Sequence, residues 1–180
     1  MNDKSTLLVV DNNPNNLFVM KSVITGLLDN CEIITASNAK EGLKYAVSSP
    51  IDVALIDVQM PDMDGIEMCS KLNADVRIDF PVILITAHQT SPAFRARGLD
   101  AGATDFLSRP IDNIELLAKI KVAIRIRKNE EKLKIAQNEF RKLNSELEER
   151  AQKRTLELEI TNEALQKSER QNRSIIKLAR

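Results

Sequence analysis

The sequence predicts an α/β protein in which a doubly wound parallel sheet of five strands precedes one long C-terminal helix. Three observations favour this fold class. Short apolar runs recur every 20–30 residues in the first part of the chain, with segments of helical spacing between them. The runs are continuous rather than alternating, which is typical of parallel strands covered on both faces. Finally, all glycines and prolines lie at or before Pro110, so neither residue interrupts a helix after it.

Five strands are expected along the first two thirds of the chain. Their predicted ranges are Leu7–Val10, Glu32–Ala36, Val53–Ile56, Val82–Ile85 and Phe106–Leu107. Because each run is followed by a segment with helical spacing, the order is a repeated βα unit, for which an open doubly wound sheet is the economical arrangement.

The helices between these strands are indicated by apolar spacing and by capping residues. Buried faces are expected at Leu17, Met20, Lys21, Ile24 and Leu28, and at Leu43, Ala46 and Val47. Asn38 with Glu41 and Asp112 with Glu115 have the spacing of capping pairs, which predicts helix starts there. Asp64 is expected to cap a helix that begins at Gly65, and Asp62 to be a solvated loop residue.

The chain divides into two parts of different charge. Residues 1–124 carry 16 acids and 11 bases, whereas residues 125–180 carry 10 acids and 15 bases. The distribution of glycine and proline divides the chain in a similar place. We therefore expect a globular domain over 1–124 and a coiled-coil helix over 125–180, continuous with the last helix of that domain.

Composition excludes several classes of protein. Equal numbers of acids and bases argue against a nucleic-acid or membrane surface that acts through bulk charge. Two cysteines and the single His88, expected in a solvated loop, leave no plausible zinc cluster or disulfide scaffold. No stretch approaches the ~20 apolar residues of a membrane span, and the N-terminus lacks a signal-peptide pattern. These features predict a soluble, cytoplasmic protein.

Polar residues follow the predicted strands where a doubly wound sheet forms its sites. Asp11 and Asp57 are expected to share one rim, with Thr86 and Arg109 opposite. Two neighbouring carboxylates repel, so a cation is expected between them, and oxygen ligands favour Mg²⁺. With the cation bound, Asp57 is expected to act as a nucleophile toward phosphorus and to form an aspartyl phosphate. Thr86 and Arg109 are expected to bind the phosphoryl oxygens. Taken singly, each of these residues is also compatible with a turn, a cap or a strand end.

At these residues the chain resembles the receiver domain of two-component response regulators, of the chemotaxis-regulator type. The matching motifs, which together span residues 5–124, are LLVVDNNPNNL (7–17), LIDVQMPDMDGIEM (55–68), PVILITA (81–87) and AGATDFLSRPI (101–111). The resemblance implies a flavodoxin-like sheet of strand order 2-1-3-4-5.

The resemblance also implies a role for individual residues. Asp57 is the expected phosphoacceptor, Asp11 helps to hold Mg²⁺, and Gln59 offers its backbone carbonyl to the same ion. Thr86 is expected to shift toward the phosphoryl group, and Phe106 occupies the aromatic switch position that follows it.

Two residues depart from the family pattern. Asn12 stands where a second acid usually contacts the metal, so it offers a carbonyl oxygen but no charge, and weaker Mg²⁺ binding is expected. Arg109 replaces a near-invariant lysine. Its planar guanidinium can bind phosphate through two donors, but it is not geometrically equivalent to the compact ammonium group of lysine.

The C-terminal part reads as one helix from Asn113 onward, with an apolar seam. The seam runs through Leu133, Ala136, Phe140, Leu143, Leu147, Ala151, Leu158, Leu165 and Ile175, and through the polar positions Arg154, Thr161, Ser168 and Asn172. Two successive steps of four residues around Leu147 form a stutter. This pattern favours a parallel two-stranded coiled coil and a homodimer. The alternatives are a solvated helix or a monomer that folds back on itself.

These observations predict phosphorelay signal transduction rather than enzyme activity. The expected partners are an upstream histidine kinase or phosphotransfer protein, a second copy of the chain and a downstream output domain, with no nucleic acid and no membrane. One alternative is a phosphorylation-independent, receiver-like dimerisation scaffold. The other is a phosphatase with an aspartate nucleophile, which is disfavoured because Gln59 stands where such enzymes need a second acid.

Overall fold

The five predicted strands form a single parallel sheet. A computed structural model describes residues 4–87 and 91–178, with side chains described up to residue 167. The strands are β1 (Ser5–Val10), β2 (Cys31–Ala36), β3 (Val53–Asp57), β4 (Val82–Ala87) and β5 (Asp105–Arg109). Their order in the sheet is β2-β1-β3-β4-β5, which confirms the predicted topology.

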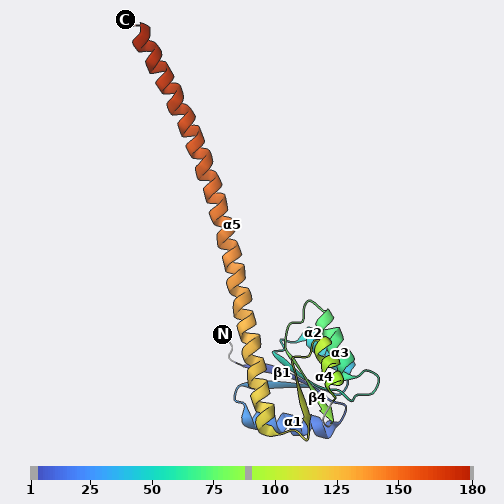
Figure 1. Ribbon diagram of the computed structural model, residues 1–180. Coiled ribbons are helices and arrows are strands. Elements are labelled where there is room, and N and C mark those ends of the chain that lie inside the picture. Colours follow the sequence, from blue (N-terminus) through green and yellow to red (C-terminus); the bar gives the residue numbers. More distant parts are fainter. Residues whose placement is uncertain (1–3, 88–90, 179–180) are drawn as a thin grey trace. The chain divides into compact units, whose positions relative to one another are not determined.

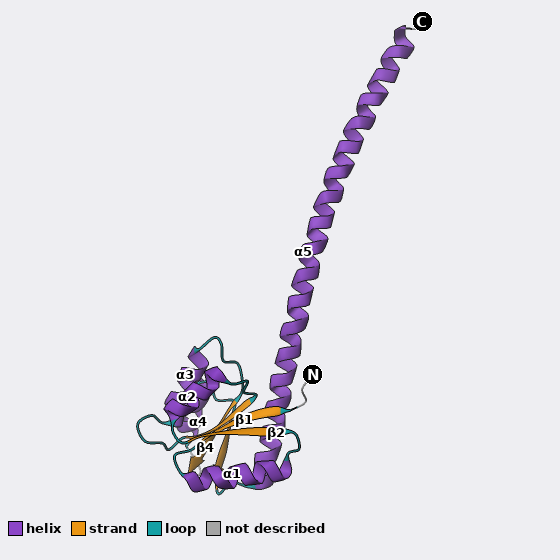
Figure 2. Cartoon of the chain, turned by 180° about the vertical axis from the view of Figure 1, so that it is seen from behind, coloured by secondary structure: helices purple, strands orange, loops and turns teal. Residues whose placement is uncertain are grey.

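Five helices connect or follow these strands. They are α1 (Pro14–Leu27), α2 (Ala39–Ser48), α3 (Gly65–Ala74), α4 (Pro92–Asp100) and α5 (Asn113–Leu178). Figures 1 and 2 show α2, α3 and α4 gathered on one side of the sheet, with α1 and the first part of α5 on the other. The predicted strands were short by one or two residues at several ends. Asp57 is the last residue of β3, where it pairs with Ile85.

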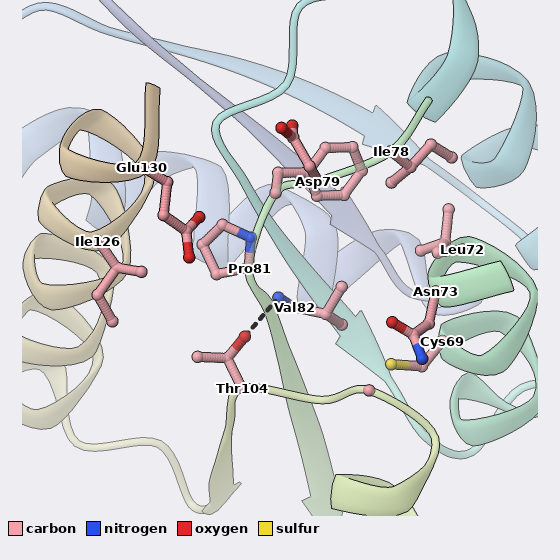
Figure 3. A pocket seen from close by; sticks show the side chains of 12 residues that line it. Cys69, Leu72, Asn73, Ile78, Asp79, Pro81, Val82, Thr104, Ile126 and Glu130 are labelled. Atoms are coloured by element: carbon pink, nitrogen blue, oxygen red, sulfur yellow. Dashed lines mark hydrogen bonds between the residues drawn. The ribbon is translucent and has the colours of Figure 1, made fainter. Parts of the chain in front are cut away.

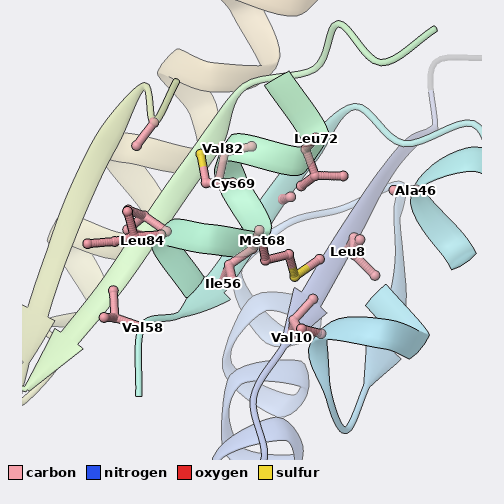
Figure 4. Close-up of a cluster of buried hydrophobic side chains, with 14 of the residues drawn as sticks. Leu8, Val10, Ala46, Ile56, Val58, Met68, Cys69, Leu72, Val82 and Leu84 are labelled. Carbon is pink, nitrogen blue, oxygen red and sulfur yellow. The ribbon is translucent and has the colours of Figure 1, made fainter. Parts of the chain in front are cut away.

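Alternate residues of each central strand supply two separate cores. Leu8 and Val10 of β1 pack with residues of α2 and α3, including Met68 (Figure 4). Leu7 and Val9 face the other way and pack with residues of α1 and α5. Both faces of the sheet are therefore covered, as the continuous apolar runs predicted.

Two of the predicted buried positions were wrong. Lys21 is exposed, because α1 packs on the sheet chiefly through Met20 and Ile24. Val47 is also exposed, because α2 buries Ala39, Gly42 and Ala46 instead. A Cβ on Gly42 would lie 2.9 Å from a methyl carbon of Val10, so the missing side chain is what lets α2 approach the sheet along this line.

The predicted helix caps are confirmed. Asn38 accepts a hydrogen bond from the Glu41 N–H at 2.9 Å, although the Glu41 carboxylate returns to the Ser37 N–H rather than to Asn38. Asp64 accepts from the Glu67 N–H at 2.7 Å. At the start of α5, Asp112 accepts from the N–H groups of Ile114 and Glu115.

The long helix α5 crosses two compact units, residues 1–131 and 132–180. In the first unit, Arg127 forms an ion pair of 2.6 Å with Asp79. In the second, the apolar side chains of Leu133, Phe140 and Leu143 are more than half exposed. His88 and the side chains of Ser168, Asn172 and Ile175 lie outside the described residues. In the described part of the chain, no helix is both long enough and apolar enough to cross a membrane.

Gly65 controls the approach of α3 to the end of β3. A Cβ at this position would meet the carbonyl oxygen of Asp57 and would lie 2.9 Å from the Cα of Val58. The Gly65 N–H also donates to the carbonyl of Val58 at 3.0 Å. Because backbone atoms cannot move aside as a flexible side chain can, only glycine fits without displacing Asp57.

We predict that Gly65→Ala lowers the free energy of unfolding by about 1–3 kcal/mol, the cost of overpacking. Gly26→Ala is the matched control, since a Cβ there meets no atom within 4 Å. In a helix that change is expected to stabilise by up to about 1 kcal/mol. Urea unfolding followed by circular dichroism measures both. Equal effects of the two substitutions would contradict the role of Gly65.

Candidate functional site

The ends of four strands bring the predicted site residues to one edge of the sheet. Asp11 directly follows β1, Asp57 ends β3, Thr86 is the penultimate residue of β4, and Arg109 ends β5. Because β1, β3, β4 and β5 are parallel and adjacent, these carboxyl ends share one edge. The side chains of Asp11 and Asp57 are 0% and 8% exposed, so both carboxylates are largely removed from bulk water.

The guanidinium of Arg109 lies between the two carboxylates. Its Nη2 is 2.6 Å from Oδ2 of Asp11 and 3.0 Å from Oδ1 of Asp57. The sequence predicts Arg109 opposite the carboxylates, whereas in the structure its guanidinium contacts both. A cation between the two acids was expected, and here the protein supplies one from its own chain. Such pairing offsets the cost of burying like charges together.

Asp11 is held by further donors from the start of α1. The Asn13 N–H donates to Asp11 Oδ1 at 2.8 Å. The Asn16 Nδ2 lies 3.1 Å from Oδ1 and 3.0 Å from Oδ2. Sequence reasoning missed both residues. The available signal was the run of asparagines after Asp11, because Asn13 caps α1 and Asn16 lies in its first turn, near the end of β1.

The carboxylate of Asp57 accepts fewer hydrogen bonds than that of Asp11. Its Oδ2 accepts one hydrogen bond, from the Gln59 N–H at 3.1 Å, and its Oδ1 contacts Arg109. Burial raises the pKa of the Asp57 carboxyl above its ordinary value; the negative charge of Asp11 adds to the rise, and the bonds from Arg109 and Gln59 oppose it. Each oxygen of Asp57 thus has an acceptor position beyond the contact named here.

The two predicted switch residues are buried on neighbouring strands. Thr86 is 4% exposed, and its hydroxyl donates to the Ala87 carbonyl at 3.4 Å rather than to Asp57. Phe106 is also buried; its ring packs against Gly98 and lies 5.7 Å from the guanidinium carbon of Arg95. Thr86 therefore lies near the carboxyl edge without a hydrogen bond to the carboxylates, whereas Phe106 lies further back in the sheet, paired with Leu84 of β4.

The oxygen donors at this edge are of the type that Mg²⁺ prefers. Asp11 and Asp57 supply carboxylates, and Asn12, which is exposed, carries an amide oxygen. Within the described ranges no cluster of three or more His, Cys, Asp or Glu could hold a metal ion. Mg²⁺ commonly binds through one or two carboxylates and keeps several waters, so the residues present fit that ion in chemistry.

A separate pocket of about 240 Å³ opens at the amino-terminal end of β4 (Figure 3). Cys69, Asn73, Pro81 and Glu130 are among its lining residues. Thr104 also lines it and accepts a hydrogen bond from the Val82 N–H at 3.3 Å. None of the predicted site residues lines this pocket, so it is separate from the edge at Asp11 and Asp57.

Comparisons with known proteins show which family this domain resembles. The family model of the response regulator receiver domain matches residues 7–121. Response regulator PleD of Caulobacter vibrioides is 36% identical over 122 residues, which is 67% of this chain and 26% of that protein. The alkaline phosphatase synthesis transcriptional regulatory protein PhoP of Bacillus subtilis is 34% identical over 130 residues, 69% of this chain and 50% of PhoP. The chain thus spans a quarter to a half of these relatives.

Solved structures show the same fold. The CheY-like receiver domain protein of Methanospirillum hungatei superposes with a TM-score of 0.63 at 26% identity, covering 71% of this chain and 99% of that one. The chemotaxis protein CheY4 of Vibrio cholerae gives 0.62 at 26% identity, covering 67% and 98%. The matched model, the relatives and the sheet order agree, and the chain belongs to the family of response regulator receiver domains, the phosphorelay modules of two-component signalling.

Proposed function

We propose that residues 1–124 form a receiver domain that accepts a phosphoryl group on Asp57. The observation that carries the proposal is the position of Asp57, buried beside Asp11 and Arg109 at the carboxyl edge of the sheet. The protein contacts the Asp57 carboxylate through Arg109 and the Gln59 N–H, and a phosphorylated partner would approach it from the open edge of the sheet. Receiver domains take part in exchange with histidine kinases or phosphotransfer proteins, and we expect such a donor here.

In the proposed reaction, an oxygen of Asp57 attacks the phosphorus of a phosphohistidine on the donor. A P–O bond forms, the P–N bond breaks, and its electron pair returns to the imidazole nitrogen, which then takes a proton. Arg109 offers donors to the phosphoryl oxygens, which carry the charge of the transition state. The Thr86 hydroxyl leaves the Ala87 carbonyl and turns toward a phosphoryl oxygen.

Receiver domains generally bind Mg²⁺ at the phosphorylation site. In this chain the residues that would hold the ion are Asp11, Asn12, Asp57 and the backbone carbonyl of Gln59. When bound, Mg²⁺ neutralises negative charge on the carboxylates and the incoming phosphoryl group. Asn12 contributes no charge, so the remaining neutralisation falls to Arg109.

We further propose that residues 125–180 transmit the change as a coiled coil in a homodimer, toward an output domain. The continuity of α5 from Asn113 to Leu178 supports this, because a helix without glycine or proline has no residue at which it readily disengages. The exposed apolar side chains of Leu133, Phe140, Leu143 and Leu147 support a partner, because an unpartnered helix of this length has little to stabilise it.

A phosphorylation-independent scaffold is the second candidate function. Arg109 already neutralises the carboxylate pair, and Asn12 lacks the charge of a second metal ligand. Both features are compatible with a domain that serves only to hold a dimer. Equal dimer affinity with and without beryllofluoride, a phosphoryl mimic, would favour the scaffold over the phosphorelay.

Phosphorylation is predicted to occur at a single site. Incubation with Mg²⁺ and a small acyl phosphate should add the mass of one phosphoryl group, as measured by intact mass spectrometry. Asp57→Ala should abolish the adduct, because the nucleophile is removed. Asp62→Ala, at an exposed loop position outside the site, is the control and should retain it. An adduct that persists in Asp57→Ala would refute the assignment.

The dimer is predicted to depend on the seam. Leu143→Asp should shift sedimentation equilibrium toward the monomer, because a buried charge in the seam has no partner. Leu156→Asp is the matched control: Leu156 is 58% exposed against 56% for Leu143, but it lies off the predicted seam. Equal weakening by both substitutions would contradict the seam, and a monomeric parent chain would contradict the dimer itself.

A further inference from the structure

The buried face of α5 ends before its contacts with the domain do. Leu116, Ile120 and Ala123 of α5 are buried in the core that it shares with α1, and no later side chain of α5 that the structure describes is buried. Further along, Ile126 and Glu130 border the pocket of about 240 Å³ whose opposite wall includes residues of α3 (Figure 3). Well-packed interiors have few voids larger than a water molecule, so close packing does not hold this turn of α5.

An ion pair attaches α5 to the domain at this level. Nη1 of Arg127 lies 2.6 Å from Oδ1 of Asp79, a residue of the loop between α3 and β4 (75–81). The two side chains are partly buried, with 20% and 34% of their surface exposed. Short hydrogen bonds between charged groups are strong, and partly buried pairs are screened less by salt than exposed ones. The pair therefore supports a turn that apolar packing leaves unsupported.

The same guanidinium carries a cost in the closed arrangement. Nε of Arg127 is buried and has no hydrogen-bond partner within the described part of the chain. A buried donor without an acceptor has lost its bonds to water, which costs free energy. Separation of Arg127 from Asp79 would return Nε to water. Part of the energy of the ion pair is thus offset, so the closed arrangement is less favoured than a fully satisfied pair would make it.

The α3–β4 loop has bonds of its own that do not involve α5. The Ile78 N–H donates to the Asp75 carbonyl at 2.9 Å. At the other end of the loop, the Pro81 carbonyl accepts the Ala54 N–H at 3.0 Å, which ties the loop to the sheet. Departure of Arg127 breaks neither bond, so the pair can open as a local event while the loop keeps its shape.

We infer that the ion pair of Arg127 and Asp79 is a latch that fastens α5 to the α3–β4 loop and opens while the domain stays folded. Cys69 reports on this latch, because it is fully buried and lies in the wall of the pocket that Asp79 and α5 border. An open latch widens the pocket and gives reagents in solution access to the Cys69 thiol.

The latch deepens the proposed function, and its role rests on that proposal. If α5 carries the signal to the coiled coil, a closed latch makes the turn at Arg127 move with the domain, whereas an open latch frees that turn. Phosphoryl transfer does not need the latch, because Asp57 lies at the carboxyl edge of the sheet and the pocket lies at the amino-terminal end of β4.

The test measures how fast N-ethylmaleimide modifies Cys69 in the full chain at fixed pH, with Cys31→Ser removing the other thiol. Asp79→Asn and Arg127→Gln should each speed the reaction at least about tenfold, because either one removes the charged pair. Arg125→Gln is the matched control: it removes the same charge from an exposed position on α5 and should leave the rate unchanged.

Exchange of the two charges separates a latch from a general loss of stability. The double variant Asp79→Arg with Arg127→Asp restores an ion pair, so slow modification of Cys69 should return. Three results would overturn the inference: unchanged rates in Asp79→Asn and Arg127→Gln, equal acceleration by Arg125→Gln, or a charge-exchanged variant as fast as the single ones. Modification no faster than global unfolding, measured by circular dichroism in urea, would overturn it as well.

A second measurement tests the role of the latch in signalling. In Asp79→Asn the acyl phosphate should still form its adduct on Asp57, whereas the effect of beryllofluoride on dimer affinity should be lost. An effect as large as that in the parent chain would overturn the role. A parent chain that does not respond to beryllofluoride would contradict the phosphorelay instead, and the rates of Cys69 modification would still decide whether the latch exists.

Discussion

The ion pair that Arg109 makes with Asp11 and Asp57 is the interaction on which the rest of the site depends. Two carboxylates that are almost fully buried cannot both stay ionised side by side without a neighbouring positive charge. The guanidinium supplies that charge from the end of β5 and joins the ends of three strands, because Nη2 contacts residues at the ends of β1 and β3. Removing the guanidinium would leave both buried carboxylates without a compensating charge, at a cost of about 3–5 kcal/mol.

The parallel order of the strands and the glycine at position 65 bring Asp11, Asp57 and Arg109 close enough to form this ion pair. Parallel order brings the carboxyl ends of β1, β3, β4 and β5 to one edge, and the absence of a Cβ at Gly65 lets α3 begin close against Asp57. The same edge continues, through the residues after Arg109, into the start of α5. A change at the ion pair therefore acts on β5, whose end is directly connected to the helix that we propose to carry the signal.

Much of the fold, and the gathering of the candidate site residues at one edge of the sheet, could be predicted from the sequence, because both follow from patterns along the chain. Apolar runs indicated the strands, and the rule that sites form at carboxyl ends selected Asp11, Asp57, Thr86 and Arg109. The spacing of residues along the sequence does not show how far a side chain extends or which groups it contacts. Arg109 was placed across from the acids because strand order specifies where its Cα lies, not where its guanidinium ends. Asn16 was missed because its amide meets Asp11 only once α1 is folded back against β1. Val47 was assigned to the core because the pattern does not show how closely Gly42 lets α2 approach.

A double-mutant cycle tests the central claim most directly. The substitutions are Asp11→Asn and Arg109→Gln, alone and together, with the free energy of unfolding measured in urea in the absence of divalent ions. If the two side chains form the pair described, their effects are not additive, and the coupling energy should reach about 1–3 kcal/mol. Effects that add to within about 0.5 kcal/mol, as expected for independent sites, would contradict the account.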